Sequence, residues 1–249
     1  MDISHRIISN VSVDCVIFGF DFEKLNVVLA ERKFNDPLTG EIIIKDFTLA
    51  GYHIFEDEDL DNAAYRISKD RTGLENLYLE QFGTFGKIDR VAKAKDQLWL
   101  KLIDQGFAKR IVTVGYFALI NSSQVTLNSD QYKIRWFPVE EASQMELAFD
   151  HNEILQKALE SLRNKVRTEP IAFELLPERF TLTQLQKLYE AITGNSIDKR
   201  NFRKKKLQMP FIVPMKEKQE GVSHRPARLF HFNIDIFNET RNERICNLF

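Results

Sequence analysis

The sequence has little cysteine and no long apolar run. Its 249 residues contain two cysteines, Cys15 and Cys246, too few for a metal cluster or a disulfide framework, and we expect both to be free thiols. No apolar run approaches the roughly 18 residues that a membrane span needs, and the N-terminal segment lacks the basic and then apolar pattern of a signal peptide. These absences argue against a disulfide-stapled or membrane-embedded protein and predict a cytoplasmic one.

Charge is distributed unevenly along the chain. Hydrophobic residues make up 43% and charged residues 29%, as in globular proteins, and the length fits one large or two modest domains. Residues 170–249 contain 14 Lys and Arg against 9 Asp and Glu, whereas residues 1–169 contain 21 against 27. The basic second part favours a polyanionic partner. Two prolines, Pro170 and Pro177, mark the connection, which predicts domains at 1–167 and 168–249.

Residues 180–206 have the pattern of a helix-turn-helix. Thr181 is followed three residues later by Gln184, the signature of a capping box at a helix start. Gly194 ends this first helix, and Ser196 can cap a second, strongly basic one. The apolar residues at helical spacing in the first helix are Leu182, Leu185, Leu188, Tyr189 and Ile192. On charge alone, the basic helix is as typical of a solvated surface as of a DNA-reading element.

Two strand-like segments, 210–215 and 227–233, follow the basic helix and flank a basic, glycine-containing tip, which is the pattern of a wing. Base contacts are predicted for Arg200, Asn201 and Arg203, because Arg pairs with guanine and Asn with adenine. Phosphate or backbone contacts are predicted for Thr181, Thr183, Gln184, Lys199, Lys204, Lys205, Lys206, Lys216, Lys218, His224 and Arg225. Since helix-turn-helix proteins use two-fold symmetry, we expect a homodimer on palindromic double-stranded operator DNA.

The first domain alternates strand and helix patterns. Strands are predicted near 11–20, 27–31, 42–49, 77–85, 111–120 and 132–139, and helices at 58–73 and 150–166. The first helix has an apolar stripe formed by Leu60, Ala63, Ala64 and Ile67. His151 lies at the start of the second helix and is interpreted as part of its cap. The fold class is therefore α+β or α/β, a mixed sheet with flanking helices followed by a winged helix-turn-helix.

The loop and helix at 52–74 resemble the signature box of the Nudix family. Laid on that box without gaps, the family's first glycine is Tyr52, its first glutamate is Glu58 and its arginine is Arg66, and Gly73 and Leu74 close it. The three metal-binding glutamates correspond to Ile67, Asp70 and Arg71. Because Mg²⁺ requires oxygen ligands, Ile67 and Arg71 predict a degenerate box, with no metal, no cofactor and no efficient hydrolysis.

Beyond the box, the chain resembles the Nudix-related transcriptional regulators, on tracts 85–90, 112–120 and 173–206. The resemblance implies a Nudix-like effector domain followed by a winged helix-turn-helix. Members respond to ADP-ribose or to pentoses such as L-arabinose. The eroded metal positions favour the pentose branch and regulation of sugar catabolism, with ADP-ribose or a sugar phosphate as the alternative effector. Candidate effector-binding residues are Lys45, Tyr52, Glu58, Asp89, Arg90 and Tyr116.

Two other function classes remain open on the sequence. An active Nudix hydrolase of ADP-ribose-like nucleoside diphosphates with an accessory nucleic-acid-binding domain would explain the fold, but Ile67 and Arg71 argue against it. A non-catalytic RNA-binding or scaffold protein would explain the basic second part. It gives no reason for a helix and wing with duplex-reading geometry.

Overall fold

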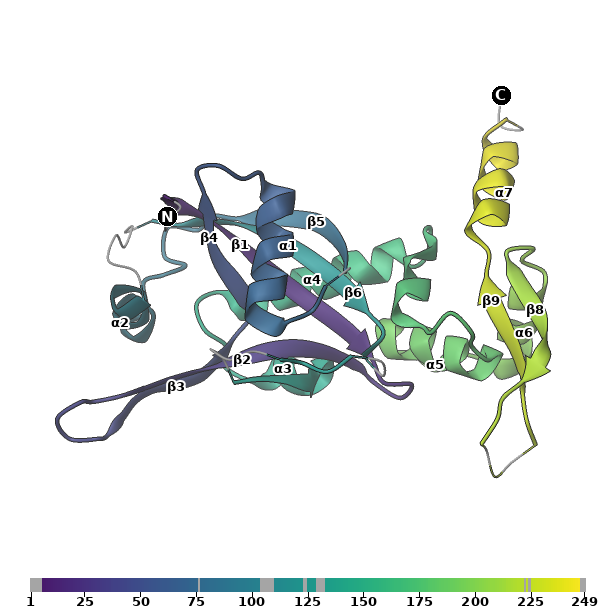
Figure 1. The fold of residues 1–249 in the computed structure, drawn as a ribbon, viewed down its shortest axis with the longest axis horizontal. Helices are drawn as coiled ribbons and strands as arrows, with labels where there is room; N and C mark the ends of the chain where they lie inside the picture. The colour runs from purple at the N-terminus through teal and green to yellow at the C-terminus, as the bar shows by residue number, and fades with distance from the viewer. Residues whose placement is uncertain are drawn as a thin grey trace, which may run out of the picture.

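The computed structural model describes residues 6–75, 77–103, 110–122, 125–128, 133–221, 223 and 225–246. Within these ranges, seven strands form one mixed sheet, in which β1 is parallel to β6 and the other pairs are antiparallel (Figure 1). The strand order is β3-β2-β1-β6-β5, with β4 paired to β1 and β7 to β2. The strands are β1 (Ile7–Phe20), β2 (Leu25–Asn35), β3 (Ile42–Thr48), β4 (Ala50–Phe55), β5 (Tyr78–Phe85), β6 (Val112–Ile120) and β7 (Ile134–Pro138).

Helices cover both faces of this sheet, because successive residues of β1 point to opposite sides. On one face, Val13, Cys15 and Ile17 pack with residues of α1 (Leu60–Thr72). On the other, Val16 and Phe18 share a buried cluster with the apolar side of α4 (His151–Lys165). Burial raises the pKa of the Cys15 thiol to about 12, so this cysteine is not a nucleophile.

Local signals account for the ends of α1. The Asp59 carboxylate accepts the Asn62 amide at 2.8 Å, and Gly73 closes the helix in the left-handed conformation with φ 71°. Glu58, the predicted first residue, therefore lies just outside the helix. Two further helices of the first domain, α2 (Ala94–Ile103) and α3 (Val139–Gln144), were not expected from the sequence.

The sheet opens between β2 and β4. Strand β1 pairs with β4 from Ile7 to Cys15 but with β2 only from Phe18 to Phe20. Strands β2 and β3 consequently diverge from β1 and β4, and in Figure 1 the β2–β3 hairpin extends away from the body of the domain. The opening between the two halves of the sheet contains a cavity.

The second domain is a winged helix. It comprises the 3-10 helix η2 (Pro170–Leu175), α5 (Leu182–Thr193), α6 (Lys199–Leu207), β8 (Ile212–Lys218), β9 (Arg228–Phe232) and α7 (Ile234–Cys246). Strands β8 and β9 pair antiparallel as the wing. Phe18 of the sheet, Leu162 of α4, Ile171 of η2 and Leu188 of α5 belong to one buried cluster, so the connection is part of the core.

None of the helices in the described part of the chain combines the length and apolarity that crossing a membrane requires.

Candidate effector cavity and nucleic-acid interface

A cavity of about 200 Å³ lies where β2 and β3 diverge from β1 and β4. Ser12 and Asp14 of β1, Arg32 of β2, and Tyr52 and His53 of β4 contribute to its walls. Residues from outside the sheet also contribute to the lining, among them Arg71 at the end of α1, Arg90, Trp99 of α2, Phe149 and His151. The cavity therefore combines aromatic faces with charged groups from elements that are far apart in the sequence.

Asp14 and His151 form the polar floor of the cavity. The Leu49 amide donates to His151 Nδ1 at 3.0 Å, so Nδ1 carries no proton and the neutral ring holds its hydrogen on Nε2. Nε2 lies 3.6 Å from Asp14 Oδ1. Burial lowers the pKa of His151, although the nearby Asp14 opposes this shift. His151 is therefore neutral near pH 7 and does not cap α4, since the N-cap residue Asp150 precedes it.

Arg90 joins this floor to the start of α4. Its guanidinium donates to both carboxylate oxygens of Asp150, at 2.9 and 3.0 Å, and to Asp14 Oδ2 at 3.3 Å. The Arg90 side chain is 4% exposed, so these two carboxylates balance a buried charge.

The position of the Asp14 carboxylate depends on Gly51 of β4, which pairs with Asp14 between neighbouring strands of the sheet. A Cβ built on Gly51 would lie 2.0 Å from Asp14 Oδ1, far inside van der Waals contact. Only glycine at this position leaves room for the carboxylate.

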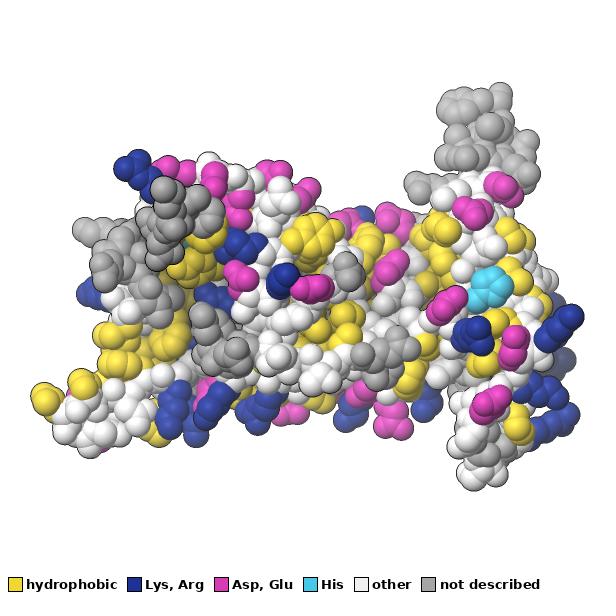
Figure 2. Space-filling model, in the orientation of Figure 1, with side chains coloured by type: hydrophobic (Ala, Val, Ile, Leu, Met, Phe, Trp, Pro, Cys, Tyr) yellow, Lys and Arg dark blue, Asp and Glu magenta, His cyan; other side chains and the backbone are white. Residues whose placement is uncertain are grey.

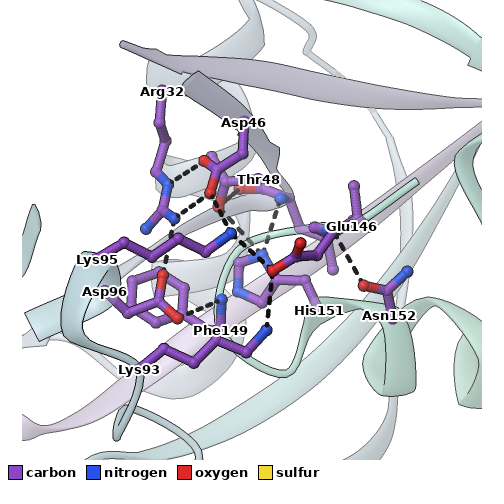
Figure 3. Close-up of polar contacts among 12 residues, drawn as sticks. Arg32, Asp46, Thr48, Lys93, Lys95, Asp96, Glu146, Phe149, His151 and Asn152 are labelled. Carbon is purple, nitrogen blue, oxygen red and sulfur yellow. Dashed lines mark hydrogen bonds and ion pairs between the residues drawn. The ribbon is translucent and has the colours of Figure 1, made fainter. Parts of the chain in front are cut away.

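A second ion network closes the side of the cavity that α2 covers (Figure 3). Arg32, whose side chain is 1% exposed, donates to both oxygens of Asp46 and to Asp96, each at 2.7 Å. Burial alone would raise the pKa of Asp46, but the hydrogen bonds from Arg32 and Lys95 outweigh it and hold the pKa below its ordinary value. Asp96 also accepts the Phe149 amide at 3.1 Å. The network fastens α2 to β2, to β3 and to the segment before α4.

Two of the six predicted effector residues, Tyr52 and Arg90, line the cavity. The other four lie elsewhere. Lys45 and Asp89 are exposed. Glu58 accepts from Arg66 Nε and from the Phe55 amide, both at 2.8 Å. Tyr116 lies on the α1 face and donates to Asp61 at 2.6 Å, where burial and that carboxylate raise its pKa.

Sequence reasoning missed most of the cavity residues. Asp14, Arg32 and His53 lie in strands whose apolar pattern gave no sign of a site, and Trp99 belongs to an unexpected helix. A signal did exist for Arg71, because it replaces a metal-binding glutamate of the box.

The first helix of the winged domain starts as the capping box predicts. Thr181 Oγ1 accepts the Gln184 amide at 3.1 Å, and Gln184 Oε1 accepts the Thr181 amide at 2.7 Å. Gly194 ends α5 with φ 72°. The second helix is capped by Asp198, which accepts the Asn201 amide at 2.7 Å, and not by the exposed Ser196. Asp198 sits directly before the first helical residue, where an N-cap must be.

The basic helix α6 is anchored by Phe202, which is buried against Tyr189 of α5 with ring centroids 5.7 Å apart. Figure 2 shows Lys and Arg side chains gathered at the end of the molecule that carries α6 and the wing. The predicted DNA contacts that are exposed on α6 are Lys199, Arg200, Asn201, Lys204 and Lys205.

The remaining predicted contacts are placed differently. Thr181 is buried and, with Gln184, forms the cap. Arg203 donates to Thr183 Oγ1 at 3.1 Å and joins α6 to α5. Lys206 Nζ lies 4.1 Å from the centre of the Tyr189 ring, and burial lowers its pKa to about 8.

In the wing, Lys216 and Lys218 are exposed on β8. Arg225 lies between the two strands, and His224 is outside the described residues.

One helix joins the cavity to the winged domain. The first residue of α4, His151, lines the cavity, and near its other end Arg163 Nε donates to the carbonyl oxygen of Ile192 in α5 at 2.8 Å. Lys165 of the same helix forms an ion pair with Glu80 of β5. A change at the cavity end of α4 therefore has a direct structural path to the helix-turn-helix.

The fold and these two sites define a class of protein, in which a Nudix-type sheet with a cavity lined by aromatic and charged residues precedes a winged helix with an exposed basic helix. Comparisons with known proteins agree. The NUDIX domain family matches residues 9–158, and the NrtR DNA-binding winged helix domain matches residues 172–232. The chain belongs to the family of NrtR-like regulators, which combine these two domains.

Relatives resemble the chain over nearly its full length. The ADPR responsive transcriptional repressor NtrR of Acinetobacter baylyi is 31% identical over 92% of this chain and 84% of its own. The crystal structure of Shewanella oneidensis NrtR complexed with a 27mer DNA has a TM-score of 0.65 at 28% identity, covering 91% of this chain and 94% of that one. A MutT/nudix family protein from Enterococcus faecalis, 22% identical with a TM-score of 0.63 over 90% of this chain and 88% of that one, shares the fold.

Proposed function

We propose that the protein is a transcriptional regulator whose Nudix domain senses ADP-ribose or a closely related nucleoside diphosphate sugar and whose winged helix binds operator DNA. The observation that carries this proposal is the course of α4, from His151 in the cavity to the Arg163–Ile192 contact with α5. The Acinetobacter relative named for its response to ADPR supports the effector class. The expected pentose effector, and with it a role in sugar catabolism, receives no support from the relatives.

The cavity suits one part of such a ligand. Its volume of about 200 Å³ is below the roughly 300–1,000 Å³ of sites that enclose whole drug-sized ligands, so it would enclose part of a nucleotide sugar. Trp99, Phe149 and Tyr52 offer rings for a base or a ribose face, and Ser12 and Asp14 offer acceptors for hydroxyl groups.

On the DNA side, Arg200 and Asn201 are proposed to read bases and Lys199, Lys204 and Lys205 to bind phosphates, because all five are exposed on α6. Lys216 and Lys218 of the wing would contact the backbone. We further propose a homodimer on a palindromic site, with the effector domains of the two chains setting the spacing of the two recognition helices. A ligand shifts such an equilibrium only if it binds the DNA-competent and incompetent states differently.

Thermal unfolding of the full chain with ADP-ribose, L-arabinose and ribose tests the effector class. A ligand at about 100 times its Kd stabilises the folded state by about 2.7 kcal/mol, so ADP-ribose should raise the melting temperature and the two sugars should not. Stabilisation by L-arabinose alone would reverse the assignment. The DNA function is tested by gel shift with duplexes from upstream of the protein's own gene. ADP-ribose should change the bound fraction, and sedimentation should find two chains per duplex.

A further inference from the structure

The guanidinium of Arg32, in the wall of the cavity, has one nitrogen without a partner. Nε and Nη2 donate to the two oxygens of Asp46 and to Asp96, each at 2.7 Å. Nη1 is buried and has no hydrogen-bond partner among the residues that the structure describes. Figure 3 shows this nitrogen without a dashed line. Because buried donors in native proteins are almost always paired, Nη1 indicates a place for an acceptor from outside the chain.

Two aromatic rings flank this guanidinium. Its carbon atom lies 4.9 Å from the centre of the Phe149 ring and 5.4 Å from the centre of the Trp99 ring. All three residues line the cavity, although they come from β2, from α2 and from the segment before α4. Aromatic faces beside a buried donor suit a flat ligand group that carries an acceptor in its own plane.

The charges around Arg32 favour a neutral acceptor over a phosphate. Asp46 and Asp96 balance Arg32 together with Lys95, whose Nζ lies 3.1 Å from Asp46. A phosphate at Nη1 would lie within reach of these two carboxylates, and like charges repel strongly where water is excluded. A ring nitrogen of a base accepts a hydrogen bond without carrying a charge. The Arg32 side of the cavity is therefore suited to the base of a nucleotide and not to its phosphates.

The backbone of Phe149 shows that its ring is held in place by its surroundings. Its φ of 51° lies in the left-handed region, which bulky residues rarely adopt. The Phe149 amide donates to Asp96, the carboxylate that also accepts from Arg32. The ring packs against a small buried cluster that contains Val91 and Leu100. Residues constrained in this way concentrate at ligand sites, which supports a binding role for the ring.

The metal positions of the Nudix box lie outside this arrangement. Ile67 is fully buried in the core under α1, and Asp70 is 61% exposed and is not part of the cavity wall. The third position, Arg71, is cationic. Within the described ranges, no three His, Cys, Asp or Glu residues gather as a set of metal ligands. These residues do not fit a divalent cation, and a contact between Arg32 and a base needs none.

We propose that Arg32, Trp99 and Phe149 form the base subsite of the effector, in which Arg32 Nη1 donates to a ring nitrogen of the base and the two rings contact its faces. This inference rests on the proposed sensing of ADP-ribose or a related nucleoside diphosphate sugar. It assigns the base to the side of the cavity that α2 covers. Arg32 then selects the effector by its base, because a ligand without the acceptor leaves a buried charged donor unpaired.

Isothermal titration of the full chain with ADP-ribose and three deaza analogues tests the subsite. Each analogue replaces N1, N3 or N7 of adenine with C–H, so it removes one acceptor and keeps the shape of the ring. One of the three should bind the wild type about tenfold more weakly or worse, because it cannot pair Nη1, and the other two should bind within about threefold of ADP-ribose.

Two variants locate the effect. Arg32→Lys keeps a cation facing Asp46 and Asp96 but lacks Nη1. It should bind ADP-ribose about tenfold more weakly, and the selective loss with one analogue should disappear because the donor is absent. Trp99→Leu leaves the hydrogen bonds of Arg32 intact and removes one ring, so it should weaken the binding of ADP-ribose and preserve the selective loss.

Arg135→Lys is the matched control. The Arg135 guanidinium also lies over two rings, those of Phe47 and Phe137, but this arginine does not line the cavity. The variant should keep both the affinity for ADP-ribose and the selective loss. Melting temperatures verify that all three variants are folded.

Each outcome separates the two proposals. Equal wild-type affinity for ADP-ribose and all three analogues would mean that water pairs Nη1, and it overturns the subsite. A selective loss that persists in folded Arg32→Lys, or wild-type affinity in Trp99→Leu, also overturns it. These results leave the effector class standing. Absence of ADP-ribose binding by the wild type overturns the proposed function itself.

Discussion

Arg163 of α4 donates its Nε hydrogen to the main-chain oxygen of Ile192, 2.8 Å away in the last turn of α5. The bond connects the effector domain to the helix that precedes the recognition helix. It also satisfies a carbonyl that the helix end leaves without an intrahelical partner.

Removing this bond should uncouple the two domains. Arg163→Ala is expected to lower the free energy of unfolding by about 1.5–3 kcal/mol, the range for a hydrogen bond that involves a charged group. DNA affinity without effector should change little, whereas the effect of ADP-ribose on that affinity should shrink. Urea unfolding and anisotropy titrations measure both quantities. The exposed Arg167→Ala is the control, and an unchanged effector response in Arg163→Ala would contradict the coupling.

Gly51→Ala should abolish effector binding. The added Cβ would lie 2.0 Å from Asp14 Oδ1, so the carboxylate must leave the cavity floor and its contacts with Arg90 and His151 are lost. Gly83→Ala on β5 is the matched control, because its nearest contact would be an ordinary 3.7 Å. Titration with ADP-ribose should show no binding for the first variant and wild-type binding for the second. Equal affinity in both would mean that the cavity floor is not part of the effector site.

Stability should fall below about pH 6.5 because of His151. Burial lowers the pKa of its imidazole in the folded protein below the ordinary value of 6.5. Between these two values the unfolded chain binds a proton that the folded chain does not, so the stability present above pH 6.5 is lost as the pH decreases. One proton contributes up to about 1.4 kcal/mol per pH unit.

His151→Asn removes this titration and keeps an acceptor for the Leu49 amide. Urea midpoints from pH 7.5 to 5 should therefore decline less steeply for the variant. Parallel declines would show that carboxylates alone govern the acid sensitivity.

The lysines of α6 should differ in their contribution to DNA binding. Lys204 is exposed, whereas Lys206 Nζ lies over the Tyr189 ring. On a nonspecific duplex, Lys204→Ala should reduce the slope of log K against log salt concentration by about 0.9, the value for one lost phosphate contact. Lys206→Ala should leave the slope almost unchanged and lower thermal stability instead. An equal change in slope for the two variants would place Lys206 on the phosphates.

Local patterns predicted the parts of this fold that depend on local interactions. The apolar stripe of α1 and the capping box of α5 involve residues three or four apart, and the structure confirms the mixed sheet and the winged helix. The sequence did not predict helix α2, because ion pairs with residues distant in the sequence hold this helix against the rest of the first domain. Its Asp96 meets Arg32, which is 64 positions away in the chain, and no local pattern records such a partner. The cavity was hard to predict for the same reason, since its walls come from strands that meet only after folding.

The N-cap residue of α6 was likewise not determined by the local sequence pattern. Both Ser196 and Asp198 are good N-cap residues, and the pattern of the basic helix does not decide between them. In the folded protein α6 begins at Lys199, so Asp198 and not Ser196 occupies the N-cap position.

The buried cluster that includes Phe18, Ile171 and Leu188 also limits how this architecture can be rearranged. A winged helix joined by a loose tether could be exchanged between proteins as a portable cassette. Transfer of this winged helix to another domain, with the junction at residues 167–168, would expose Ile171 and Leu175, which are buried here. Each Å² of apolar area exposed in this way costs roughly 25 cal/mol. A change of operator preference must therefore be made within α6 and the wing, where residues face outward. The helices η2 and α5 must stay with the sheet against which they pack.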